Sequence, residues 1–252
     1  MGRMESIIVY EEHPKLERPV FIEGLPGVGN VGKIAADLLM ESLGAKRFAS
    51  IYSRHFPPQV TLDEDCIVEM ANNELWYVRG VGGGADIIFL KGEYQGSTAE
   101  GQFDLARDMM GALLELDVSK IITLGGYGTG AMVDEPRVMG AANGKEIKEE
   151  MSEHGVLFRS GEPTAGIVGA SGVFLGLGKI YGIPGVCLMG ETSGYFVDHK
   201  SAMAIIGVLE RFLGVEVDTA DLKEKADQID VLTAKVKEYE DTQNNEDLGY
   251  IG

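Results

Sequence analysis

Two nucleotide-binding patterns overlap in one short stretch of the sequence, GLPGVGNVGK. Gly27, Gly29 and Gly32 match G-x-G-x-x-G, which lets a strand-to-helix turn approach the pyrophosphate of a dinucleotide. The same residues match G-x-x-x-x-G-K, in which Lys33 would reach the phosphates of a nucleotide. A phosphate loop continues with a Ser or Thr that binds magnesium, but here the next residue is Ile34. The magnesium-binding hydroxyl is therefore missing.

The dinucleotide interpretation needs an acidic residue at the end of the following strand. That strand is expected at 48–53, and Arg54 follows it. We therefore expect the glycines to form a sharp strand-to-helix turn, with Asn30 as the N-cap of the helix. A ligand site at the same glycines and Lys33 is the alternative. Lys33 would then contact a phosphate, and otherwise an acidic neighbour.

A second candidate site follows the predicted strand at 184–192, in the stretch GETSGYFVDHK. Glu191, Thr192, Tyr195 and Asp198 bring two carboxylates, a hydroxyl and a phenol to the carboxyl end of a buried strand. Ligand crevices in α/β folds form at such ends. Carboxylates at these positions also cap the next helix or bind a neighbouring subunit, and the sequence favours these structural roles.

No complete catalytic or metal-binding set emerges from the sequence. Ser171 lies in GASGV, where Val173 replaces the second glycine of a nucleophile elbow, so Ser171 is expected to be a helix N-cap. The histidines have no partner at metal-ligand spacing. They are His13, His55, His154 and His199. We therefore predict no catalytic residues, no metal and no cofactor.

Composition indicates a globular chain of 252 residues, with 44% hydrophobic and 25% charged residues. The 22 basic and 40 acidic residues leave a formal charge of -18, which disfavours nucleic acid and anionic membranes as partners. Cys66 and Cys187 lie in apolar surroundings without C-x-x-C spacing and are expected to be buried thiols. No apolar run is long enough for a signal peptide or a membrane span, so a cytoplasmic protein is expected.

Short β-rich runs alternate with helical patterns, which predicts an α/β fold with a wound sheet. An antiparallel meander is expected over 66–92. The predicted strands are 6–10, 19–25, 48–53, 66–71, 74–82, 85–92, 120–128, 164–170 and 184–192. The predicted helices are 30–44, 97–117, 171–182 and 200–214.

The composition changes after Gly214, so residues 1–216 are expected to form one domain, 217–241 an amphipathic helix and 242–252 a mobile tail. Apolar residues repeat at heptad spacing in the helix, as in a short coiled coil or a helix that docks on a neighbouring subunit. They are Leu222, Ile229, Leu232, Val236 and Tyr239.

Five motifs in order make residues 19–214 resemble the archaeal branch of the proteasome assembly chaperone family, the type-2 chaperone relatives. They are FIEGLPGVGNVGKIAADLL, HFPPQV, EYQGSTAEGQFDLARDMM, LGGYGTG and GVFLGLGKIYGIPGVCLMGETSGYFVDHKSA. The resemblance implies a three-layer α/β/α sandwich with a mixed central sheet, distantly like nucleoside phosphorylases. It also implies homo-oligomers and non-catalytic work on proteasome α-subunits or the 20S particle.

Some proteasome-binding members of this family end in a hydrophobic residue, a tyrosine and one further residue. This chain ends Leu248-Gly249-Tyr250-Ile251-Gly252 and is a near match. Its tyrosine is third from the end instead of second, and a glycine instead of a hydrophobic residue precedes it. One extra residue displaces the terminal carboxylate by about 3 Å. The tail is therefore either a proteasome anchor or an inert end.

The sequence thus predicts a non-enzymatic, homo-oligomeric chaperone or adaptor for the proteasome. The alternative is a small-molecule protein or enzyme, with a nucleoside or nucleotide held by the glycine-rich loops.

Overall fold

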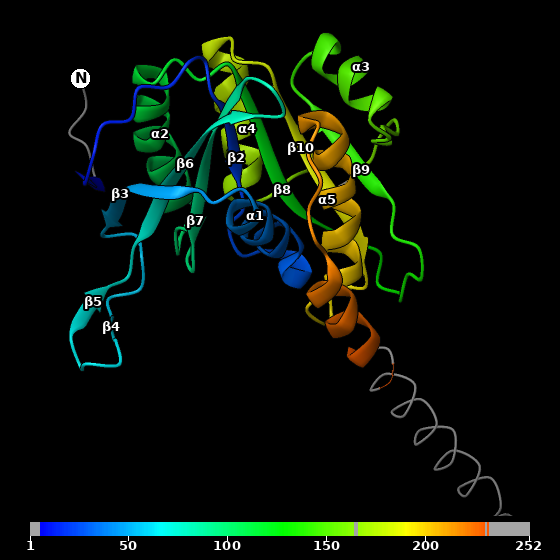
Figure 1. Cartoon of the computed structure of the whole chain (residues 1–252), viewed down its shortest axis with the longest axis horizontal. Coiled ribbons are helices and arrows are strands. Elements are labelled where there is room, and N and C mark those ends of the chain that lie inside the picture. Colours follow the sequence, from blue (N-terminus) through cyan, green and yellow to red (C-terminus); the bar gives the residue numbers. More distant parts are fainter. Residues whose placement is uncertain (1–5, 164–165, 230, 232–252) are drawn as a thin grey trace, which may run out of the picture. The chain divides into compact units, whose positions relative to one another are not determined.

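A mixed sheet of eight strands runs through the computed structural model, which describes residues 6–163, 166–229 and 231. The strands are β1 (Ser6–Tyr10), β2 (Val20–Glu23), β3 (Lys46–Ser53), β6 (Asn73–Val81), β7 (Ala85–Gly92), β8 (Lys120–Gly128), β9 (Val138–Ala142) and β10 (Gly185–Thr192). They lie in the order β1-β3-β6-β7-β2-β8-β10-β9 (Figure 1).

The four strands at the centre of the order, β7, β2, β8 and β10, are parallel, and the outer strands pair antiparallel. Every residue of β2 and of β10 is buried. Continuous burial is typical of parallel strands that helices cover on both faces. A separate hairpin, β4 (Val60–Leu62) with β5 (Val68–Met70), projects away from the sheet (Figure 1).

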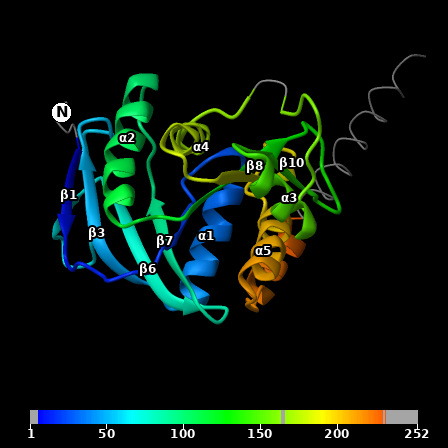
Figure 2. The ribbon, with the colours of Figure 1, turned by 90° about the horizontal axis from the view of Figure 1, so that it is seen from above.

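Helices lie on both faces of the sheet (Figure 2). They are the 3-10 turn η1 (Val28–Asn30) and the helices α1 (Val31–Ser42), α2 (Ala99–Glu115), α3 (Lys145–Glu153), α4 (Ala170–Tyr181) and α5 (His199–Leu213). One pair, α1 and α5, covers one face, and α2 packs with α4 on the other. The predicted mixed α/β architecture is confirmed, whereas the likeness to nucleoside phosphorylases stays a prediction.

The core on the α2 and α4 side is built from aromatic and aliphatic side chains of the sheet and the two helices. Phe21 of β2 and Phe174 of α4 are fully buried, with ring centroids 5.2 Å apart. Complete burial of such a side chain contributes about 1.5–3 kcal/mol. This packing sets α4 against the central strands, and its first turn lies beside their carboxyl ends.

The structure corrects several predicted elements. β6 and β7 form the expected antiparallel pair, but residues 68–70 pair with β4 outside the main sheet. Residues 166–169 form no strand, because Gly166 and Gly169 have φ of 75° and 90°. The missed helix α3 is short and mostly polar, and only two of its residues, Ile147 and Met151, are buried and apolar.

The second unit of the chain begins at Asp218. Within it, residues 220–229 are helical. The predicted amphipathic helix over 217–241 as a separate part of the chain stays a prediction. Leu222 and Ile229 of the predicted apolar repeat lie on this helix. Leu232, Val236 and Tyr239 lie outside the described residues, as does the expected tail at 242–252.

The fold depends on the close approach of α1 to β8. A Cβ atom added to Gly32 of α1 would lie 2.2 Å from the carbonyl oxygen of Leu124 in β8. Gly24, before the helix, is equally restricted, since its Cβ would lie 2.1 Å from that of Ala36. Glycine is therefore required at both positions for packing.

We expect Gly32→Ala to lower the free energy of unfolding by about 1–3 kcal/mol, because backbone atoms must move to admit the methyl group. This loss would exceed the gain of about 1 kcal/mol from the higher helix propensity of alanine. Urea denaturation followed by circular dichroism measures the difference.

Gly27→Ala is the matched control, because no atom lies within 4 Å of its added Cβ and its φ of −158° suits any residue. It should change the stability by less than about 0.5 kcal/mol. Equal losses in the two variants would contradict a packing role for Gly32.

Candidate functional site

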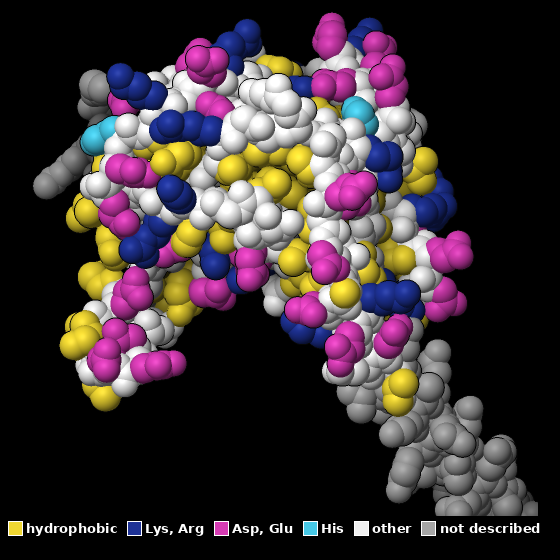
Figure 3. Space-filling view, viewed as in Figure 1, with side chains coloured by type: hydrophobic (Ala, Val, Ile, Leu, Met, Phe, Trp, Pro, Cys, Tyr) yellow, Lys and Arg dark blue, Asp and Glu magenta, His cyan; other side chains and the backbone are white. Residues whose placement is uncertain are grey.

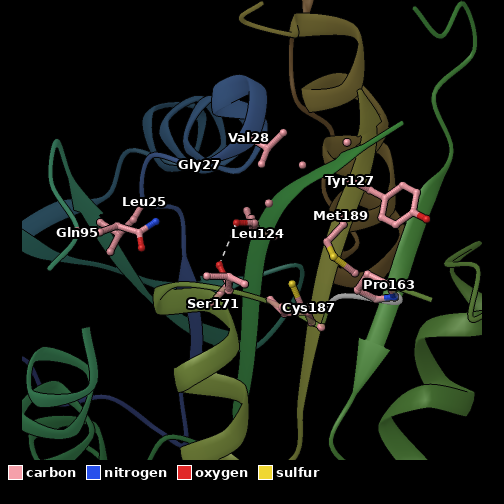
Figure 4. A pocket seen from close by; sticks show the side chains of 16 residues that line it. Leu25, Gly27, Val28, Gln95, Leu124, Tyr127, Pro163, Ser171, Cys187 and Met189 are labelled. Carbon is pink, nitrogen blue, oxygen red and sulfur yellow. Dashed lines mark hydrogen bonds between the residues drawn. The ribbon is translucent and has the colours of Figure 1, made fainter. Parts of the chain in front are cut away.

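Glycine-bearing segments meet at one end of the sheet, where the parallel strands β2, β8 and β10 have their carboxyl ends. A cavity of about 370 Å³ opens between these segments and the start of α4 (Figure 4). Gly27 and Val28 line it from the turn after β2, residues 124–128 from β8, Met189 from β10 and Ser171 from α4. The candidate site therefore lies where α/β folds bind ligands.

The glycine turn before α1 is used mainly for packing. Gly29 has a φ of 62°, and its carbonyl accepts a hydrogen bond of 2.9 Å from the N–H of Asp198. Asn30 holds the predicted N-cap position with a φ of 50°, and its side chain makes no capping hydrogen bond. Of the three motif glycines, Gly27 lines the cavity, while Gly29 and Gly32 do not.

Lys33 contacts two acidic neighbours. Its Nζ lies 2.7 Å from Asp37 Oδ2 and 3.0 Å from Glu93 Oε1. Burial alone would lower the pKa of Lys33, but its hydrogen bonds to Asp37 and Glu93 outweigh this effect and raise it. The described residues that line the cavity do not include Lys33.

Glu191 is buried at the end of β10 and pairs with Arg137, which precedes β9. Its Oε2 accepts from Arg137 Nε at 2.8 Å and from the backbone N–H of Arg137 at 3.1 Å. These hydrogen bonds, against an opposing effect of burial, lower the pKa of Glu191. Its carboxylate thus fastens the β8–β9 connection to β10.

The other three predicted crevice residues also lie outside the cavity wall. The carbonyl of Thr192 accepts from the N–H of Thr129 at 2.8 Å. Asp198 caps α5, because its Oδ1 accepts from the N–H of Ser201 at 2.9 Å. Tyr195 is 74% exposed. Glu191, Thr192 and Asp198 therefore hold the loops together, and Tyr195 faces solvent.

A buried carboxyl that the sequence reading missed lies behind the cavity. Glu23, the last residue of β2, is fully buried and accepts from the hydroxyl of Ser171 at 2.8 Å and from the N–H of Leu25 at 3.1 Å. Burial raises the pKa of Glu23 to about 7, although both hydrogen bonds oppose the shift. Ser171 therefore binds Glu23 from inside α4, and its predicted role as N-cap is wrong, since Gly169 holds that position.

The sequence contained a signal for Glu23, because it is the one charged residue in the apolar run PVFIEGL.

Gln95 is a second functional-site residue that the sequence reading missed, and it joins three loops. Its Nε2 donates to the carbonyl of Pro26 at 2.6 Å, and its Oε1 accepts from the N–H of Ala170 at 3.1 Å. No local pattern marks such a residue, because its partners are distant in the chain.

The two cysteines differ in environment. Cys187 lines the cavity from β10, and burial raises the pKa of its thiol to about 12. Cys66 is exposed at the turn of the β4–β5 hairpin, so the prediction that it is buried is wrong. Because the pKa of the Cys187 thiol is raised, this thiol is protonated at neutral pH and is a poor nucleophile.

The described wall of the cavity carries no charged side chain. A phosphate would meet no cation there, so the wall suits an uncharged ligand better than a nucleotide.

Within residues 6–163, 166–229 and 231, no three His, Cys, Asp or Glu side chains are grouped to hold a metal ion. No helix in the same residues has the length and apolar character of a membrane span.

Exposed apolar side chains stand beside the cavity mouth. Val28 and Val168 line the cavity and are 46% and 88% exposed. Tyr195 and Phe196 follow β10, where the backbone carbonyl of Phe196 approaches Gly29. We call Val28, Val168, Tyr195 and Phe196 the apolar rim. Exposed apolar groups of this kind mark protein-binding or ligand-binding surfaces.

Comparison with known proteins identifies the family. The model of the PAC2 family matches residues 21–237. The uncharacterized protein MJ1210 of Methanocaldococcus jannaschii is 34% identical over 246 residues, which cover 94% of this chain and 93% of that protein. The chain belongs to the PAC2 family, and the resemblance predicted from the five motifs is confirmed.

Two solved structures of Pyrococcus furiosus proteins are similar over nearly their whole length. PbaB, described as an archaeal proteasome activator, has a TM-score of 0.85 and 36% identity, covering 93% of this chain and 100% of PbaB. PbaA, described as an archaeal homologue of a proteasome-assembly chaperone, has a TM-score of 0.76 and 26% identity, covering 97% of each chain.

The environment of Glu23 predicts a specific pH dependence of stability. Its pKa is about 7 in the folded protein and ordinarily 4.5, so between these values the unfolded chain binds fewer protons. The stabilisation is complete below pH 4.5 and is lost as the pH rises through 7. Glu23→Gln keeps hydrogen-bonding groups but cannot ionise. We expect it to gain about 2–3 kcal/mol relative to wild type between pH 5 and pH 8.

Urea denaturation at the two pH values measures this gain. Glu149→Gln, an exposed change on α3, should leave the difference from wild type the same at both. A Glu23→Gln protein whose difference from wild type does not grow with pH would contradict the raised pKa.

Proposed function

We propose that this chain is a non-enzymatic, homo-oligomeric chaperone or adaptor that binds proteasome α-subunits or the 20S core particle in the cytoplasm. The observation that carries the proposal is the similarity to PbaB, a proteasome activator, at 36% identity over the whole of that structure. The three-layer, distantly nucleoside-phosphorylase-like architecture belongs to the same proposal.

The site supports protein binding better than catalysis. Glu191, Asp198 and Lys33 are engaged in ion pairs or a helix cap. In contrast, the apolar rim leaves large side chains in water. Burying such side chains against a partner contributes about 25 cal/mol per Å² of apolar surface, so the rim is the part of the site with most to gain from a protein surface.

We expect Phe196→Asp to weaken binding to the cognate α-subunit at least tenfold, because it places a charge in the apolar rim. Pull-down and native mass spectrometry of the full-length protein provide the measurement. Ile180→Asp, the same kind of change at an exposed position of α4, should leave binding unchanged. Failure of the wild type to bind α-subunit or 20S particle at tens of micromolar would refute the proposed function.

The C-terminal residues Leu248, Tyr250 and Ile251 lie outside the described residues, and their role as a particle anchor remains a proposal. Tyr250→Ala should reduce binding to the 20S particle at least tenfold if the ring is inserted between subunits. Gln243→Ala is the control in the same segment. Undiminished binding of Tyr250→Ala would assign docking to the folded domain alone.

A second function, binding of a small uncharged molecule such as a nucleoside, is favoured by the cavity of about 370 Å³ and by Ser171 in its wall. Thermal-shift measurements with nucleosides and nucleotides, with and without magnesium, test it. A saturable shift that Ser171→Ala removes and Lys33→Met retains would support nucleoside binding. A shift that depends on Lys33 and magnesium would instead support the glycine-motif prediction.

A further inference from the structure

The hydroxyl of Ser171, in the wall of the cavity, lies between two acceptor groups. Its Oγ donates to Oε2 of Glu23 at 2.8 Å. The carbonyl oxygen of Leu124 is 3.5 Å from the same Oγ, a contact drawn in Figure 4. A separation of 3.5 Å makes a weak hydrogen bond at best. The single hydroxyl proton of Ser171 is therefore directed to Glu23 whenever Glu23 can accept it.

The two carboxyl oxygens of Glu23 have different partners. Oε1 accepts from the backbone N–H of Leu25 at 3.1 Å, and Oε2 accepts from Ser171. A proton on Oε1 would face the N–H of Leu25, so that two donors would meet. When this carboxyl is neutral, its proton therefore sits on Oε2 and is donated to Oγ of Ser171.

The surroundings of Glu23 leave its charge uncompensated. Glu23 is fully buried, and the residues opposite it on β7 and β8 are Leu90 and Thr123. From α4 it meets Ser171, and from β10 it interacts with Cys187, whose pKa of about 12 keeps the thiol neutral. None of these four neighbours is a cation, and burial raises the pKa of Glu23 to about 7. Both forms of the carboxyl are therefore populated near neutral pH.

The proton on Glu23 sets what Ser171 offers to a ligand. When Glu23 is neutral, its Oε2–H is donated to Ser171 Oγ, and the hydroxyl proton of Ser171 is released to be donated into the cavity. When Glu23 is ionised, the hydroxyl proton is donated to Oε2, and Ser171 presents only lone pairs. Ser171 is thus a donor in the neutral state and an acceptor alone in the ionised state.

The size and charge of the cavity favour a small neutral ligand. Its volume of about 370 Å³ is in the range of small-molecule pockets. Figure 3 shows acidic and basic side chains spread over the face that it presents, whereas the described wall of the cavity has none. The amide of Gln95 is already bound through both its nitrogen and its oxygen. The side-chain hydroxyls of the described wall, on Ser171 and Tyr127, are left to meet polar groups of a ligand.

We propose that the cavity binds a neutral small molecule whose carbonyl oxygen or ring nitrogen accepts the hydroxyl proton of Ser171, and that protonation of Glu23 controls this contact. Ser171 is then the specificity-determining residue of the cavity, and Glu23 is a positioning residue that acts through it. The inference rests on the second function proposed above, small-molecule binding, and is independent of proteasome binding.

The ionised state discriminates between two kinds of ligand. An acceptor atom placed against the lone pairs of Ser171 loses its hydration without gaining a hydrogen bond, which is unfavourable. A donor group is accepted in both states, because Oγ keeps a free lone pair in each. Affinity for a ligand that only accepts should therefore fall as the pH rises through 7, while affinity for one that only donates should not.

Two neutral probes of opposite character test this difference. N,N-dimethylbenzamide accepts through its carbonyl and has no N–H, whereas indole donates through its N–H and has no comparable acceptor. Titration of the full chain with each probe at pH 5 and pH 8, followed by NMR, gives the affinities. We expect the affinity for N,N-dimethylbenzamide to be about five- to tenfold lower at pH 8, the effect of one hydrogen bond. The affinity for indole should not fall.

Variants of the two residues separate the roles. Glu23→Gln mimics the neutral acid, because its carbonyl can accept from Leu25 while its amide donates to Ser171, so N,N-dimethylbenzamide should bind it equally at both pH values. Ser171→Ala should weaken binding of this probe at pH 5 and remove the pH dependence. Glu149→Gln, the exposed change on α3, should keep the pH dependence of the wild type. Circular dichroism establishes that all three variants fold.

The carboxyl of Glu23 gives a readout of its own by carbon-13 NMR. Ser171→Ala should raise the pKa of Glu23, because the lost hydrogen bond favours the ionised form. Saturation of the wild type with N,N-dimethylbenzamide should raise it as well, since this probe binds the neutral form. An unchanged pKa in both cases would contradict the coupling between the two residues.

Three further results would overturn the inference. They are equal affinity of the wild type for N,N-dimethylbenzamide at both pH values, a pH dependence that survives in Glu23→Gln, and no binding of either probe at millimolar concentration. Probes that bind without pH dependence would leave the second function standing. The thermal-shift measurement with nucleosides decides that function separately, and the α-subunit pull-down decides the first.

Discussion

The close packing of α1 on β8 is the constraint on which the site depends. Gly32 meets the carbonyl of Leu124, and Gly126 meets the carbonyl of Val28, so added Cβ atoms would overlap backbone at 2.2 and 2.3 Å. Because backbone cannot rotate out of the way as a side chain does, these contacts tolerate only glycine. They draw the turn after β2 onto the carboxyl end of β8, and the loop after β10 then closes over the turn through the bond between Asp198 and Gly29.

Because these glycines serve the packing of α1 on β8, a nucleotide-binding sequence motif can lie next to a cavity whose described wall carries no charged side chain. Two of the three glycines that would bring backbone N–H groups to a phosphate in a dinucleotide-binding protein, Gly29 and Gly32, are occupied here by packing contacts. The cation of the motif, Lys33, is bound by Asp37 and Glu93. The carboxyl of Glu23 is held behind the wall by Ser171. What remains open is a cavity whose described wall is uncharged and includes Gln95, Tyr127 and Ser171.

The exposed apolar side chains of this structure are consistent with a protein that acts by binding other proteins. Membership of the PAC2 family and the similarity to PbaB and PbaA place this chain among homologues of proteasome activators and assembly chaperones. The apolar rim and the hairpin are separate surfaces on different loops of the same unit. In the function proposed above, the apolar rim contacts the proteasome.

Local sequence determined the alternating elements, the turn before α1 and the family, because these depend on periodicity, on glycine at restricted positions and on the order of motifs. Tertiary structure alone decided which side chains meet. Ser171 and Glu23 are 148 positions apart, and Arg137 and Glu191 are 54 apart. Nothing near Ser171 in the chain distinguishes a helix cap from a partner for a buried carboxyl. That distinction arises only when the packing of Phe174 on Phe21 sets the first turn of α4 beside the end of β2.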